Sequence, residues 1–126
     1  PEADTVVTGN MSLTGTFLNL GNEATDNFVT GGLSFHSSGN TFITSNAAIE
    51  ICGVNSVGDV LTLNVNGNLT DLGPARTEVQ TRAVFTGVDV VIGDLADDCF
   101  DILNGGAANL FVTASGAEDV TVACSE

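Results

Sequence analysis

Three cysteines, Cys52, Cys99 and Cys124, carry the most distinctive chemistry of this 126-residue chain. Because their number is odd, one internal disulfide leaves one thiol over. We expect Cys99 to pair with Cys124, which would stabilise the fold by about 3 kcal/mol; Cys52 with Cys124 is the second candidate pairing. In the first case Cys52 either fills a small apolar space or links two subunits. No CxxC motif is present, which argues against a zinc or redox site.

An acidic cluster is the best candidate for a metal site. Its members are Asp94, Asp97, Asp98 and Asp101. A hard cation such as Ca²⁺ binds several carboxylate and carbonyl oxygens, although the spacing matches no EF-hand loop. On a helix these aspartates would share one face, where like charges repel one another. Either a bound Ca²⁺ or plain solvent must screen that repulsion, and residues 118–119 could join the cluster.

The residues needed for catalysis are scarce. The chain has one histidine, His36, and no Lys, Tyr or Trp. A nucleophile with a histidine base would therefore depend on His36. The other route is a glycosidase-type pair of carboxylates, but such sites usually bind sugar rings on aromatic platforms, and the only aromatic residues here are seven Phe. We expect this histidine to be exposed at the tip of a hairpin around residues 35–40. The sequence thus predicts a protein that is not an enzyme.

The formal net charge is −14, with 16 acidic residues against two arginines. Phosphate backbones and anionic membrane surfaces are bound through Lys and Arg, so neither is an expected partner. Arg76 and Arg82 are an even number of residues apart, which would place both on the same face of one strand. They could dock against the acidic surface of an identical neighbour or pair with carboxylates of their own chain.

Several features favour an extracellular protein. The chain begins at Pro1 rather than at a methionine, which is expected after removal of a secretory leader. Disulfides also persist mainly outside the cytoplasm. Two sequons, at Asn10 and Asn68, would allow N-glycosylation. No apolar run is long enough for a transmembrane helix, so we expect no membrane insertion.

Apolar and polar residues alternate along much of the chain, as they do in β-strands. Similar Thr- and Gly-rich segments begin at Thr8, Thr30 and Val57, which are 22 and 27 residues apart. We interpret these segments as duplicated hairpins, because the spacings are too uneven for a solenoid. The Asn66-Gly67 pair predicts a tight turn between two strands of a hairpin.

One segment departs from the strand pattern. Leu95, Cys99, Ile102 and Leu103 follow helical spacing, and Asp94 can cap the start. This predicts one short helix near residues 95–103. The rest of the chain predicts an all-β fold of the β-sandwich or jelly-roll type, with an open barrel as the alternative. Residues 1–126 are expected to form a single domain.

These features favour contacts between proteins over catalysis. We expect a structural subunit of an extracellular self-assembling filament, pilus or surface layer, joined by β-strand addition between subunits. In this hypothesis residues 1–20 form an extended strand that pairs with a neighbouring copy. The contact residues would be Met11, Leu13, Phe17, Arg76 and Arg82. The alternative is a secreted β-sandwich module that binds Ca²⁺ or a glycan, although Trp and Tyr, the usual platforms for sugar rings, are absent.

Overall fold

The computed structural model describes residues 4–6, 9–21, 27–29, 32–93, 99–104, 109–116 and 120–122 of the 126. No residue in these ranges lies in an α-helix, and no helix that could cross a membrane is found among them. The strands are β1 (Asp4–Val6), β2 (Asn10–Gly15), β3 (Leu18–Leu20), β4 (Asn27–Val29), β5 (Gly32–Ser37), β6 (Thr41–Ser45), β7 (Ile49–Val57), β8 (Val60–Val65), β9 (Leu69–Val79), β10 (Arg82–Gly87), β11 (Val90–Ile92), β12 (Cys99–Ile102), β13 (Leu110–Ala114) and β14 (Val120–Val122).

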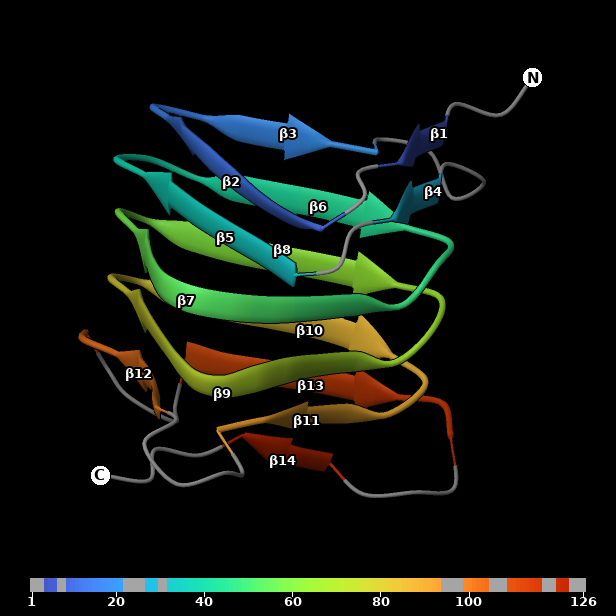
Figure 1. Ribbon diagram of the computed structural model, residues 1–126. Helices are drawn as coiled ribbons and strands as arrows, with labels where there is room; N and C mark the ends of the chain where they lie inside the picture. The colour runs from blue at the N-terminus through green and yellow to red at the C-terminus, as the bar shows by residue number, and fades with distance from the viewer. Residues whose placement is uncertain are drawn as a thin grey trace.

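Two large parallel sheets make up most of the fold. One has the strand order β14-β11-β9-β7-β5-β2, with β12 also paired to β9, and the other has the order β13-β10-β8-β6-β3. Strands β1 and β4 form a separate parallel pair. The chain passes from one large sheet to the other at almost every corner and returns one level further along the stack (Figure 1). This winding of stacked coils is a β-solenoid.

The predicted all-β class is confirmed, but the β-sandwich and jelly-roll topologies are wrong. Those folds are built from antiparallel strands, whereas every strand pair described in this chain is parallel. The Asn66-Gly67 turn is a corner between β8 and β9, which belong to different sheets, and not a hairpin turn. Alternation of apolar residues indicates a strand with one buried face and carries no information about the direction of its partner.

The number of residues from one coil to the next varies, which explains why the uneven spacing in the sequence did not indicate a solenoid. Asn10 pairs with Gly32, so the 22-residue offset between the first two similar segments is the true register. Elsewhere the offset varies, from 18 residues between Leu33 and Ile51 to 30 between Val90 and Val120. Strands keep their register while the connections between them differ in length. An uneven repeat is therefore compatible with regular stacking.

The predicted helix near residues 95–103 is also wrong where the structure describes it. Cys99–Ile102 is strand β12, which pairs in parallel with Arg76–Val79 of β9. Cys99, Phe100 and Ile102 are buried and Asp101 is exposed. Phe100 packs edge to face against Phe85, with ring centroids 5.2 Å apart. Of the apolar residues that fit helical spacing, Cys99 and Ile102 lie in this strand, whereas Leu103 follows it and is 44% exposed. The pairing with β9 satisfies the backbone of the strand.

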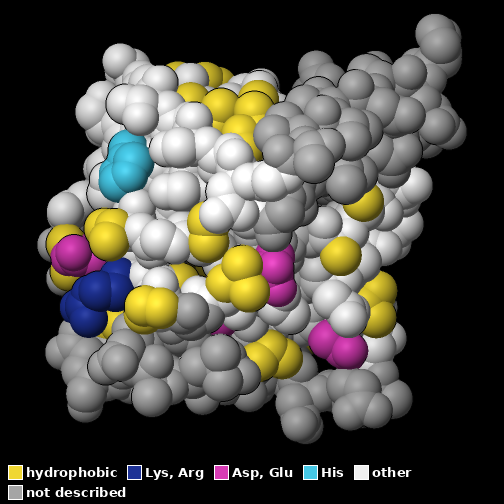
Figure 2. Space-filling model, in the orientation of Figure 1, with side chains coloured by type: hydrophobic (Ala, Val, Ile, Leu, Met, Phe, Trp, Pro, Cys, Tyr) yellow, Lys and Arg dark blue, Asp and Glu magenta, His cyan; other side chains and the backbone are white. Residues whose placement is uncertain are grey.

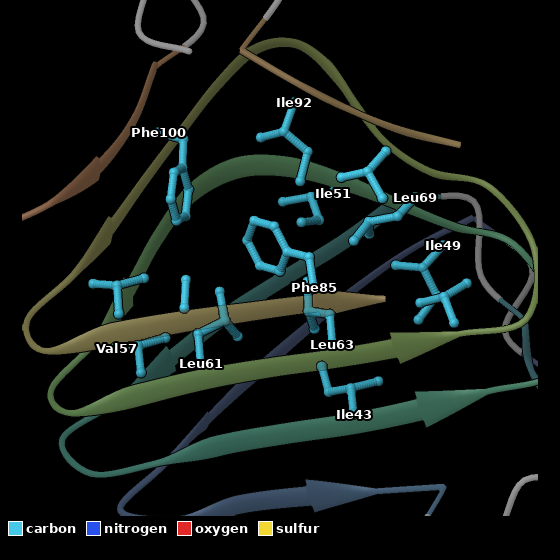
Figure 3. Packing of buried hydrophobic residues seen from close by; sticks show 14 of the residues in the cluster. Ile43, Ile49, Ile51, Val57, Leu61, Leu63, Leu69, Phe85, Ile92 and Phe100 are labelled. Atoms are coloured by element: carbon cyan, nitrogen blue, oxygen red, sulfur yellow. The ribbon is translucent and has the colours of Figure 1, made fainter. Parts of the chain in front are cut away.

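The core lies between the two sheets, whose inward side chains interdigitate (Figure 3). Residues in register form apolar columns that run along the stack, so each coil packs on the next. One such column consists of Leu20, Ile43, Leu63, Phe85 and Val112. Its three central members are fully buried. Such columns form because the solenoid repeats the same inward position once per coil.

A polar network crosses this apolar core at the bend of the long strands. The pairing of β7 shifts register against both β5 and β9, which interrupts the ladder. Asn55, only 1% exposed, compensates for this. Its Oδ1 accepts a hydrogen bond from the Phe35 amide at 2.8 Å, and its Nδ2 donates to the Cys52 carbonyl and to Thr77 Oγ1, each at 3.2 Å. The side chain thus replaces the ladder bonds that the bulges remove.

The corners of successive coils are hydrogen-bonded like the strands. Gly58 donates its amide to the Ser37 carbonyl at 2.9 Å, and Thr81 donates to Asp59 at 3.1 Å. This brings the backbones into direct contact. A Cβ atom on Gly58 would overlap the carbonyl oxygen of Ser38. Glycine is required at position 58 because a side chain there would collide with the backbone of the preceding corner.

Candidate functional site

His36 lies in the middle of β5 and not at a hairpin tip. Its half-buried side chain lies on the outward side of the strand, since Phe35 and Ser37 on either side are buried. Nδ1 is 3.1 Å from Oγ of Ser56, the residue in register on β7. The prediction that the histidine sits at a loop tip is therefore wrong. Its observed contact joins two neighbouring strands, and the expectation that the chain is not an enzyme remains a prediction.

The structure describes two of the three cysteines. Cys52 is a free thiol on β7, and Cys99 is buried on β12. Cys124 lies outside the described residues, so the Cys99–Cys124 disulfide stays a prediction. The Cys52 side chain lies against the backbone of Gly32, where a Cβ atom would come within 2.8 Å of its sulfur. Glycine at position 32 makes room for this thiol.

Burial raises the pKa of the Cys52 thiol, and the neighbouring Glu50 carboxylate adds to the effect. Both influences disfavour the negative thiolate, which is the reactive form. We therefore expect iodoacetamide to alkylate Cys52 more slowly at mildly alkaline pH than it alkylates a free cysteine. Replacement of Glu50 by glutamine should move the midpoint of the rate profile to lower pH, while burial keeps it above the ordinary value. Mass spectrometry of the Cys52 peptide would measure this.

Glu78→Gln provides the control for that measurement. Glu78 is exposed on β9, and its register partner on β7 is Ser56, four residues from Cys52 and so about 13 Å along the strand. The Glu78 variant should leave the alkylation profile unchanged. Equal shifts in the two variants would contradict the local effect of Glu50.

Most of the acidic cluster cannot be placed. Asp94, Asp97 and Asp98 lie outside the described residues, as do residues 118–119. Asp101 is on strand β12, exposed and in register with Glu78, so the shared helical face is wrong for this residue. Among the described residues there is no group of three or more His, Cys, Asp or Glu side chains that could hold a metal. On the face seen in Figure 2 the acidic side chains lie apart from one another. Calcium binding stays a prediction.

The two arginines do not share a strand. Arg76 is on β9 and Arg82 begins β10, with the corner at residues 80–81 between them. The prediction that both lie on one face of a single strand is wrong because the strand ends at Val79. The Arg82 guanidinium lies over the Phe111 ring, 5.6 Å from its centroid. This cation–π contact joins β10 to β13 within the chain.

Both sequon asparagines are on the surface. Asn10 is exposed at the start of β2, and Asn68 is exposed at the corner before β9. Their accessibility is compatible with N-glycosylation, which stays a prediction.

The two ends of the stack differ from its middle. The inward side chains of the central coils, such as Leu33, Leu61 and Phe85, are fully buried. Those of the terminal coils pack against the core but are only partly buried. They are Met11, Leu13, Leu18 and Leu20 at one end and Leu110, Val112, Ala114 and Val122 at the other. Each end therefore presents an incompletely covered section of core.

The terminal strands also have one edge with no described partner. Strands β2 and β3 pair only with β5 and β6, and β13 and β14 pair only with β10 and β11. The Gly15 carbonyl accepts a hydrogen bond from the Ser38 amide, so Gly15 directs its backbone groups toward β5. In a parallel ladder alternate residues face opposite sides, which directs the backbone groups of Thr14 toward the outer edge.

A groove of about 300 Å³ lies on the outer side of the sheet that contains β3, β6 and β8. Its aromatic walls are Phe17, 58% exposed in the corner before β3, and Phe42, 38% exposed on β6. Asn19 and Thr62 are the register neighbours of Phe42 on β3 and β8. Asn40 completes the polar rim, and its Oδ1 accepts a hydrogen bond from the Val60 amide at 3.0 Å. This fixes the Asn40 amide with its Nδ2 available as a donor.

A second groove of about 440 Å³ lies further along the same strands. Asn64, Thr86 and Ser115 contribute amide and hydroxyl groups to it. At its edge Asn66 donates a hydrogen bond to Oδ1 of Asn46, one coil away, at 2.7 Å. No described residue that lines either groove is charged, although the chain carries a net charge of −14.

No protein-family model, curated protein or solved structure matches this chain. Functional residues must therefore be identified from the geometry alone. Of the predicted contact residues, the structure brings Met11, Leu13 and Phe17 together in the first coil. It separates them from Arg76 and Arg82, which lie three coils further along. Phe42 was not singled out in the sequence, because only the strand register shows which residues surround it.

Proposed function

We propose that this chain is a structural module of an extracellular assembly, in which copies stack end to end by β-strand addition between terminal coils. The observation that carries the proposal is the pair of incompletely covered ends. Each end combines partly buried apolar side chains with strand edges that have no described partner. A further coil would cover both features at once, as each central coil does for its neighbours.

The mode of addition differs from the one expected from sequence. Residues 1–20 were expected to extend as one strand toward a neighbouring copy. In the structure the segment contains β1, β2 and β3, each paired within the chain. We therefore assign the intersubunit contact to the outer edges of β2 and β3, with Met11 and Leu13 beneath them. The opposite partner is the end formed by β13 and β14, which gives a head-to-tail contact that can propagate.

Net charge should govern when this assembly forms. Copies that each carry a charge of −14 repel one another at low ionic strength. The Debye length falls from about 30 Å at 0.01 M salt to about 3 Å at 1 M. Added salt should thus permit the short-range contacts between ends. The extracellular location rests on the predicted disulfide, since disulfides persist mainly outside the cytoplasm, and an extracellular medium is also where such salt concentrations can occur.

We expect the chain to sediment as a monomer in dilute buffer and as elongated oligomers in about 1 M NaCl. Thr14→Pro should abolish the oligomers, because proline removes an outward N–H from the edge of β2. The measurement is sedimentation velocity, with electron microscopy of the same samples.

Thr14→Ala is the matched control, since it changes the same exposed side chain and keeps the amide. It should assemble as the natural chain does. Thermal unfolding of both variants at low salt would verify that the monomer folds. A chain that stays monomeric at every salt concentration, or assembles equally well with proline at position 14, would disprove end-to-end strand addition.

A further inference from the structure

The groove between Phe17 and Phe42 has the features of a site for a neutral, ring-shaped ligand. Phe42 stands between Asn19 and Thr62 in one row across three adjacent strands. Since parallel strands lie about 4.8 Å apart, these two polar side chains flank the aromatic ring at about 5 Å on each side. A ligand seated on Phe42 would therefore meet an apolar surface below and hydrogen-bonding groups on both sides.

The chemistry of the lining narrows the class of ligand. An aromatic face carries partial negative charge and attracts the C–H groups on the apolar face of a sugar ring. Amide and hydroxyl groups at the rim can bond the ring's equatorial hydroxyls. An anionic ligand would meet no cationic partner among the described lining residues and would be repelled by the charge of −14. A purely apolar ligand would leave the Asn19 and Asn40 amides without partners.

We propose that this groove binds a sugar ring of a neutral glycan, stacked on Phe42 and bordered by Phe17. Asn40 Nδ2, Asn19 and Thr62 bind its hydroxyl groups. The second groove begins two residues further along the same strands, from Phe42 to Thr44 on β6 and from Thr62 to Asn64 on β8. Two residues span about 6.6 Å. The occupant is therefore an oligosaccharide, with one ring in the aromatic groove and the next over the amide and hydroxyl groups.

The test is a titration of the full chain with cellohexaose, a neutral oligosaccharide whose rings have flat apolar faces. At low ionic strength, where the chain is expected to be monomeric, calorimetry should show saturable binding with a Kd in about the millimolar range. In nitrogen–proton correlation spectra the side-chain amide signals of Asn19 and Asn40 should shift. Phe42→Ala should weaken binding roughly tenfold, as expected for loss of one aromatic contact.

Phe111→Ala is the matched control. Phe111 is also an exposed phenylalanine on the outer side of this sheet, but it lies on β13, three strands from Phe42. Its removal should leave cellohexaose binding unchanged. The charged comparator hexagalacturonate should bind at least tenfold more weakly than cellohexaose.

Three results would overturn this inference: no saturable binding of cellohexaose, equal binding by the Phe42 variant, or tighter binding of hexagalacturonate. The inference is independent of end-to-end assembly, because Phe42 is on the outer side of a sheet and Thr14 is on an end. If Phe42→Ala abolished salt-induced oligomers and Thr14→Pro did not, the groove would be a contact between copies and no glycan site.

Discussion

Replacement of Gly58 by alanine is expected to lower the free energy of unfolding by about 3 kcal/mol. The added Cβ would overlap the Ser38 carbonyl oxygen, which belongs to the backbone of the preceding coil. Backbone atoms cannot rotate away as the end of a side chain can. The corner must therefore open, which would lengthen the hydrogen bond from the Gly58 amide to the Ser37 carbonyl.

Urea denaturation followed by circular dichroism would measure the effect of Gly58→Ala. Asp59→Ala is the control, because Asp59 is the next residue in the same corner and is exposed. It should change stability by no more than about 0.5 kcal/mol, as surface substitutions usually do. Equal stability of the Gly58 variant and the natural chain would contradict the close stacking of corners.

The second large effect is expected from Asn55→Ala, at about 3 kcal/mol. The substitution deprives the buried Phe35 amide, the Cys52 carbonyl and Thr77 Oγ1 of their bonds to this side chain. Each buried polar group left unsatisfied costs about 1–3 kcal/mol, partly offset wherever water enters the space left by the side chain. The free energy of unfolding should fall by as much as it does when a large apolar core side chain is truncated. Here the loss comes from unsatisfied polar groups and not from lost apolar contacts.

Ser56→Ala tests whether that loss is specific to the buried side. Ser56 is the next residue of β7, lies on the outer face, and contacts only His36 Nδ1 in the described hydrogen bonds. Its removal should cost less than about 1 kcal/mol. The comparison uses the same denaturation assay and a hydrogen-exchange measurement of the Phe35 amide. A Phe35 amide that stays equally protected in Asn55→Ala would refute the role assigned to Asn55.

The sequence predicted strands well and their arrangement poorly. Alternation around Leu61 and Leu63 follows directly from burial of one strand face. Parallel stacking could not be predicted from the sequence. Each strand pairs with a strand about one coil away, and the number of residues per coil differs. The 22-residue offset between Thr8 and Thr30 was the true register signal. The segment that begins at Val57 does not continue this offset, so the three segments together indicate no constant period.

The prediction of a short helix near residues 95–103 was wrong for a local reason. Cys99 and Ile102 are three residues apart, a spacing that suits a helix, and both are buried in strand β12 together with Phe100. The tertiary pairing with β9 decides between helix and strand. The role of Asn55 could not be predicted from the sequence for a similar reason. It depends on the register shifts of β7 against β5 and β9, which no neighbouring residue indicates.

The candidate sites also differ in whether the sequence could identify their residues. Met11 and Leu13 could be singled out because they alternate within one strand, and the structure places them at an incompletely covered end. The groove at Phe42 could not, because Asn19 and Thr62 are 23 and 20 residues from it in sequence. Such a site exists only once the coils are in register. If copies stack end to end, the grooves on the outer sheet stay accessible and repeat along the assembly.

Hydrogen exchange of the monomer and of the salt-induced assembly tests end-to-end stacking most directly. Amides in Asn10–Leu20 and Leu110–Ala114 should gain protection on assembly, because these segments carry the outer edges. Amides of Val60–Val65, in the middle of the stack, should exchange at the same rate in both states. Assemblies in which the terminal segments gain no protection, or a chain that forms no assembly at any salt concentration, would contradict end-to-end stacking.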